Sequence, residues 1–203
     1  MFARERKFDT PWEAKVPTAF FRGTATGGGV TVETNQRLHI AHISYEWSQQ
    51  QQQQPTEDPP HLDAKIVGWN LRDKKIASSK MTCVTKADFK GTLGENLQDN
   101  FVEIYKQSSY KYLVYVEGHC AACRYGFMMQ LGSTILKVES RCVADQMWYF
   151  PLLRPYHDHV PVKVPPRPSL PHTQLHRCSS VCLSVCLHDL RRGRPTCLTC
   201  GRR

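Results

Sequence analysis

Residues 112–138 constrain the fold of this chain more than any other segment. Residues 112–116 are β-branched and aromatic, which is typical of a buried strand, and Gly118 follows directly after this run. Residues 121–131 have the composition of a helix, and after a single glycine residues 133–138 form a second apolar run. Strand, helix and strand in this order predict a βαβ unit, and therefore an α/β fold with a parallel sheet.

Further elements are expected on the N-terminal side of this unit. Residues 18–21 resemble a strand that ends at a glycine-rich turn, and residues 62–69 form another short structured segment. Residues 34–47 are ambiguous between helix and strand, although Asn35 is a suitable helix cap. Residues 89–105 are compatible with a helix.

Two segments do not resemble parts of a domain. A run of glutamines at residues 49–54, followed closely by prolines, predicts a disordered low-complexity loop over residues 49–60. Residues 163–203 are rich in proline, cysteine and arginine, and we expect a disordered tail there. The expected organisation is therefore a polar N-terminal segment over residues 1–11, a domain over residues 12–162 and the tail.

The net charge of +9 does not by itself indicate a nucleic-acid-binding protein. Residues 164–203 contain seven arginines and a single acidic residue, Asp189, so the tail carries most of the excess positive charge. We therefore expect no specific nucleic-acid partner. No run is apolar over the length that a membrane span needs, and the first twenty residues lack the apolar core of a signal peptide.

The nine cysteines leave several alternatives open. The pair Cys120-x-x-Cys123 becomes half of a zinc site only if a second pair such as Cys197 and Cys200 reaches it from the tail. A redox dithiol is a second possibility. Buried or half-buried thiols that line a tight turn are the simplest interpretation.

Two histidines, His157 and His159, flank Asp158 and resemble a metal or acid–base cluster. On an extended segment they point to opposite faces, so only one of them can share a face with a ligand. We therefore expect no metal site in this chain.

The turn after residues 112–116 is suited to binding an anion. In a βαβ unit, ligands bind beyond the carboxyl ends of the strands, where helix amides are unpaired. Gly118 allows close approach, Ala121 and Ala122 leave space, and Arg124 adds a bidentate donor for a diphosphate.

A second arginine, Arg22, follows the strand expected at residues 18–21, together with Gly23 and Thr24. Two arginines at predicted strand ends are a stronger indication of an anion site than one. Glu139 and Asp145 follow the second strand of the βαβ unit at the same expected edge, where they suit the hydroxyls of a sugar or ribose.

A string of motifs resembles glycosyltransferase family 90, which contains capsule-associated glycosyltransferases and KDEL-containing protein O-glucosyltransferases. The resemblance spans about residues 12–162. Its motifs are Phe-Phe-Arg-Gly-Thr at 20–24, Lys-Tyr-Leu-Val-Tyr-Val-Glu-Gly-His-Cys-Ala-Ala-Cys-Arg-Tyr at 111–125, Leu-Gly-Ser at 131–133, Lys-Val-Glu-Ser at 137–140, residues 143–153 and His-Val-Pro-Val at 159–162.

The resemblance implies a GT-B enzyme with two Rossmann-like lobes that needs no metal or other cofactor. Such an enzyme moves glucose or xylose from a UDP-sugar to a hydroxyl of a protein or glycan. By position, Arg22, Gly23 and Thr24 would contact the phosphates or the sugar. Residues 119–123, including His119, Cys120 and Cys123, would hold the diphosphate together with Arg124.

The same resemblance places the catalytic base on an aspartate that precedes the Phe-Arg-Gly motif. Asp9 does not lie in a matching motif, so we assign no catalytic residue and expect a partial nucleotide-sugar lobe. The resemblance also implies the lumen of the endoplasmic reticulum or Golgi. The alternative function is a non-catalytic fragment that binds polyanions through its basic tail.

Overall fold

The computed structural model describes residues 10–54, 57–89, 97–119, 123–140 and 146–163. Its centre is a five-stranded sheet in the order β2-β1-β5-β6-β7, and every neighbouring pair of strands is parallel. The strands are β1 (Val16–Ala25), β2 (Leu62–Trp69), β5 (Tyr110–Tyr115), β6 (Thr134–Val138) and β7 (Val160–Val162). The parallel α/β fold expected from the βαβ pattern is therefore confirmed, including the pairing of β5 with β6.

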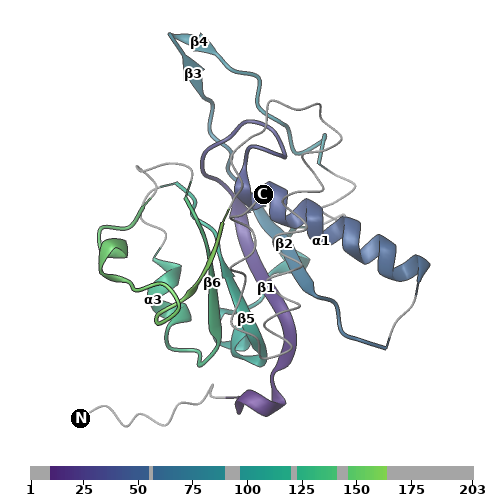
Figure 1. Cartoon of the computed structure of the whole chain (residues 1–203). Coiled ribbons are helices and arrows are strands. Elements are labelled where there is room, and N and C mark those ends of the chain that lie inside the picture. Colours follow the sequence, from purple (N-terminus) through teal and green to yellow (C-terminus); the bar gives the residue numbers. More distant parts are fainter. Residues whose placement is uncertain (1–9, 55–56, 90–96, 120–122, 141–145, 164–203) are drawn as a thin grey trace, which may run out of the picture.

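Helices cover both faces of the sheet (Figure 1). Helix α1 (Gln36–Gln53) packs on one face against Phe21 and Leu62, and helix α3 (Arg124–Met128) packs on the other against Phe20 and Leu113. Successive residues of a strand point to opposite faces, which is why adjacent phenylalanines of β1 enter different cores. The described residues also contain short 3-10 helices: η1 (Trp12–Ala14), η2 (Leu97–Asn100), η3 (Ile104–Ser109) and η5 (Phe150–Leu152).

A small antiparallel hairpin, β3 (Lys75–Ile76) with β4 (Ser79–Lys80), projects from the connection between β2 and β5 (Figure 1). No helix in the described ranges is long and apolar enough to cross a membrane.

The strand order contains a reversal between β1 and β5. From β1 the chain passes through α1 to β2 at one side, and it then returns to add β5, β6 and β7 in turn at the other side. In doubly wound sheets, such a reversal separates the loops that leave the two central strands, and ligands bind in the resulting crevice. The strand order therefore predicts a ligand site at the carboxyl ends of β1 and β5.

Helix α1 resolves the ambiguity of residues 34–47. Asn35 is the N-cap, and its side chain accepts hydrogen bonds from the amides of Arg37 and Leu38, as expected for a capping asparagine. The helix continues to Gln53, so the expected disordered loop over residues 49–60 is wrong for most of the glutamine run. Glutamine is a good helix former, and no proline interrupts the run before Pro55.

Two other expectations about elements are wrong. The described part of residues 89–105 forms turns and 3-10 segments instead of one α-helix. Strand β1 does not end at Phe21 but continues through Arg22, Gly23 and Thr24 to Ala25. The segments expected at residues 1–9 and 164–203 lie outside the described residues.

Candidate functional site

The carboxyl ends of three neighbouring strands contact one another through their loops. A Cβ atom built on Gly27, in the loop after β1, would lie 3.4 Å from the Cα atom of Gly118, which follows β5. The ring Nε2 of His119 is 3.2 Å from the carbonyl oxygen of Asn70, just after β2. The loops that leave β1, β2 and β5 therefore form one continuous edge at the strand-order reversal.

The glycine-rich loop after β1 is folded around a buried amide. The Nδ2 group of Asn35 donates to the carbonyl oxygens of Thr26 and Gly28 at 3.1 and 3.0 Å. Gly27 and Gly29 have φ values of 94° and 87°, which residues with a side chain rarely adopt. The same asparagine thus caps α1 and holds the loop in place.

Arg37 is a residue of this edge that the sequence analysis did not identify. Its Nη1 and Nη2 groups donate to the carbonyl oxygens of Thr24 and Val116, both at 3.0 Å. Its Nε group donates to the carbonyl oxygen of Glu117 at 2.9 Å. A fixed guanidinium therefore bridges the ends of β1 and β5. Its position two residues after the cap Asn35 is the signal that could have indicated it.

Arg124 is the first residue of α3, is half-buried and lies near Tyr115, the last residue of β5. Within the described ranges its guanidinium makes no hydrogen bond and no ion pair. Burial lowers the pKa of Arg124, and the nearby Tyr115 opposes this effect. An anion beside this guanidinium would offset the cost of burying its charge.

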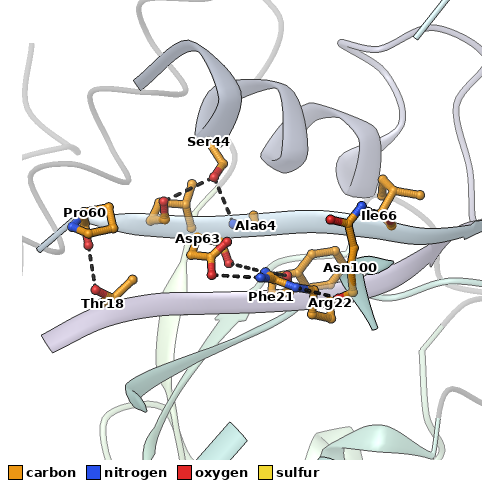
Figure 2. A network of polar contacts seen from close by, with 10 residues as sticks. Thr18, Phe21, Arg22, Ser44, Pro60, Asp63, Ala64, Ile66 and Asn100 are labelled. Carbon is orange, nitrogen blue, oxygen red and sulfur yellow. Dashed lines mark hydrogen bonds and ion pairs between the residues drawn. The ribbon is translucent and has the colours of Figure 1, made fainter. Parts of the chain in front are cut away.

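Arg22 is surrounded differently. Its side chain is buried within the sheet, and its Nη2 group lies 2.8 Å from a carboxylate oxygen of Asp63 on β2 (Figure 2). Because β1 extends past it, Arg22 is not at the strand end that the sequence had suggested. Gly23 also lies within β1, and Thr24 is half-buried near its end.

The remaining predicted site residues are divided among several positions. Gly118 and His119 lie at the edge, and Glu139 is exposed just after β6, where its carbonyl oxygen accepts a hydrogen bond from the Gln36 side chain at 2.7 Å. Cys120, Ala121, Ala122 and Asp145 lie outside the described residues. Cys123 is described and is exposed, so the interpretation of a buried or half-buried thiol is wrong for it.

The two histidines of the candidate cluster are in different environments. His157 is exposed and contacts Asp158 and Arg154, whereas His159 is half-buried against the ring of Tyr125. No group of three or more potential metal ligands occurs among the residues that the structure describes.

Sequence comparison identifies relatives in viruses and in mammals. The chain is 37% identical over 166 residues to "Uncharacterized protein 179R" of Invertebrate iridescent virus 6, which covers 77% of this chain and 13% of that protein. It is 35% identical over 157 residues to "Uncharacterized protein 035R" of Invertebrate iridescent virus 3, with the same coverage of 77% and 13%. It is 29% identical over 155 residues to "Protein O-glucosyltransferase 3" of Rattus norvegicus, which covers 75% of this chain and 22% of that protein.

The chain thus spans less than a quarter of the length of these relatives. The family model described as "Glycosyl transferase family 90" matches residues 2–167, which include every strand and helix described above. The motifs at 20–24 and 111–125 lie on β1, on β5 and at the start of α3. The chain belongs to glycosyltransferase family 90.

Proposed function

We propose that this chain is the donor-binding part of a GT-B glycosyltransferase that transfers glucose or xylose from a UDP-sugar to a hydroxyl of a protein or glycan. The observation that carries the proposal is the half-buried guanidinium of Arg124, which has no acceptor among the described residues and lies near Tyr115, the last residue of β5. Family membership supports glycosyl transfer, and the anion-binding character of this edge supports a nucleotide-sugar donor.

Arg124 and Arg37 would stabilise the departing nucleotide. A UDP leaving group gains negative charge as the glycosidic bond breaks, and fixed guanidinium groups can stabilise that charge without a metal ion. Arg37 is held by three carbonyl oxygens and supplies a positive charge that does not reorient during the reaction. Thr24 and the backbone of residues 119–123 would contribute hydrogen bonds to the donor.

Two carboxylates are proposed to contact hydroxyl groups of the donor. Glu139 and Asp145 are proposed contacts for hydroxyls of the donor sugar or ribose, and no residue of the chain is assigned as the catalytic base. The relatives named O-glucosyltransferase support a hydroxyl acceptor, and with the family they favour the lumen of the endoplasmic reticulum or Golgi as the compartment.

Isothermal titration of the full chain with UDP tests the donor site. Arg124→Ala should weaken UDP binding by roughly 10- to 100-fold, the effect of one or two charge-assisted hydrogen bonds. Arg72→Ala, which removes an exposed guanidinium after β2, is the matched control and should bind UDP like the wild type. Equal UDP affinity of Arg124→Ala and the wild type would reject the proposed donor site.

A further inference from the structure

The guanidinium of Arg22 donates four hydrogen bonds to protein acceptors (Figure 2). Its Nε group donates to the carbonyl oxygen of Asn100, and its Nη1 group donates to those of Asp63 and Phe21, all at 3.0 Å. Its Nη2 group donates to the Asp63 carboxylate at 2.8 Å. All three nitrogens therefore donate, and a phosphate that took two hydrogen bonds from this guanidinium would have to displace a partner that is already well placed.

These contacts join three segments of the chain. Arg22 belongs to β1, Asp63 to β2 and Asn100 to η2, and the Asn100 side chain in turn donates to the carbonyl oxygen of Ile66 on β2 at 3.2 Å. The guanidinium also lies 4.3 Å from the centre of the Phe20 ring. Arg22 thus fixes the position of β1 relative to β2 and η2.

An irregularity in the pairing of β1 with β2 follows directly after Arg22. Arg22 pairs with Lys65 and Gly23 with Ile66, but Thr24 pairs with Gly68, so β2 contains one extra residue at this point. Bulges of this kind change the direction of a side chain and occur next to active sites.

Thr24 is the residue whose position depends on this bulge. A Cβ atom on Gly68 would lie 3.3 Å from the Thr24 hydroxyl oxygen, so the glycine leaves room for the Thr24 side chain. The carbonyl oxygen of Thr24 accepts the hydrogen bond from Arg37, which also reaches the end of β5. Thr24 therefore lies where the β1–β2 bulge meets the carboxyl edge.

We propose that Arg22 is a positioning residue that, with Asp63 and Asn100, fixes the bulge and thereby places Thr24 for contact with the donor. Arg22 itself does not contact the phosphates. This inference rests on the proposed function and divides the Phe-Arg-Gly-Thr motif into a structural part, Arg22 and Gly23, and a ligand-contacting part, Thr24. It also gives Asp63, which lies outside every motif of the resemblance, the same role of fixing the bulge.

The division between a structural Arg22 and a ligand-contacting Thr24 is tested by binding measurements with UDP, UMP and uridine. The variants are Arg22→Met, Asp63→Asn and the double variant. We expect the two single variants to bind all three ligands more weakly by one common factor, on the order of tenfold, and the double variant to be no weaker. Thr24→Val should weaken UDP binding although Arg22 and its hydrogen bonds are intact in that variant. If Arg22→Met weakens UDP much more than uridine while Asp63→Asn binds like the wild type, Arg22 contacts phosphate and the inference is wrong.

Amide hydrogen exchange of the ligand-free chain gives a second, ligand-independent result. Residues 24–27 should exchange faster in Arg22→Met and Asp63→Asn, but at the wild-type rate in Thr24→Val. Unchanged exchange in the first two variants would overturn the inference even if UDP binds.

The proposed function and the role of Arg22 can fail separately. Failure of the wild-type chain to bind UDP would reject the proposed function, while the exchange rates would still decide the role of Arg22. Arg22→Lys and Asp63→Asn serve if Arg22→Met does not fold.

Discussion

Asn35 serves two structures with one side chain, and the two roles can be separated by substitution. Its side-chain oxygen caps α1, and its amide donates to the carbonyl oxygens of Thr26 and Gly28. Asn35→Asp keeps the capping acceptor but loses both donations, whereas Asn35→Ala loses all four contacts.

We expect Asn35→Ala to lower the free energy of unfolding by about 2 kcal/mol or more, since a lost cap costs about 1 kcal/mol and the loop carbonyls also lose their donor. Asn35→Asp should also be less stable than the wild type, because it turns a buried carboxylate oxygen toward the carbonyl oxygens of Thr26 and Gly28. Urea denaturation measures both, with the exposed Asn70→Ala as control. An Asn35→Asp variant as stable as the wild type would show that the loop does not depend on this amide.

His159 should couple stability to pH. Its Nδ1 atom is buried and has no hydrogen-bond partner in the described part of the chain, and burial together with Lys137 lowers the pKa of His159 from 6.5, against the effect of Asp158. Below about pH 6.5 the unfolded chain therefore binds this proton more readily than the folded chain, so stability falls as the pH falls.

The measurement is an NMR titration of the imidazole combined with urea denaturation at pH 7.5 and pH 5. We expect a midpoint below the ordinary histidine value, and a smaller loss of stability on acidification in His159→Phe, which keeps the ring against Tyr125. A midpoint at or above the ordinary value would contradict the expectation.

At the scale of elements, close contact between the loops after β1 and β5 depends on Gly118. A Cβ atom there would lie 2.6 Å from the Thr26 hydroxyl oxygen and 2.7 Å from Nη2 of Arg37, which is held by its hydrogen bonds. Gly118→Ala should therefore cost about 1–3 kcal/mol of stability and weaken UDP binding.

Gly126 provides the matched control for that substitution. It lies in α3, and a Cβ atom there would meet nothing within 4 Å. Gly126→Ala should leave UDP binding unchanged and raise stability by up to about 1 kcal/mol through helix propensity. If Gly118→Ala is as stable as Gly126→Ala in urea denaturation, the loops accommodate a methyl group at Gly118 and the expectation is wrong.

The strands and the cap could be predicted because their determinants are local. Strands β5, β6 and β2 are short apolar runs, and Asn35 precedes a helical pattern directly. The extension of β1 could not be predicted, because Arg22 and Gly23 disfavour a buried strand until a carboxylate 41 residues away neutralises the arginine. The sequence predicted both Arg22 and Arg124 at strand ends, but Arg22 is paired with Asp63, whereas Arg124 has no acceptor among the described residues.

Tertiary contacts also explain the errors outside β1. The glutamine run was interpreted from composition, although the helix that begins at Asn35 simply propagates into it. Residues 97–109 form 3-10 segments because they follow the surface of the sheet, where Asn100 bonds to β2. Arg37 was missed because its acceptors lie on β1 and after β5, and only the strand order brings those ends together.

At the scale of the whole molecule, the proposed donor site depends on arginines rather than on a metal ion. We expect UDP to raise the thermal midpoint of the chain equally in EDTA and in millimolar Mg²⁺ or Mn²⁺. High salt should reduce the shift, because the attraction between guanidinium and diphosphate is partly screened. A shift that disappears in EDTA and returns with Mn²⁺ would contradict the metal-independent proposal.

The strand order has a consequence for synthesis of the chain on the ribosome. Strand β1 is made first but lies in the interior of the sheet, between β2 and β5, and its second neighbour begins only at Tyr110. Until that residue has emerged, one edge of an apolar strand is exposed and able to pair with other chains. Nascent chains stalled before Tyr110 should therefore bind chaperones or aggregate, and those that extend past β5 should be protected.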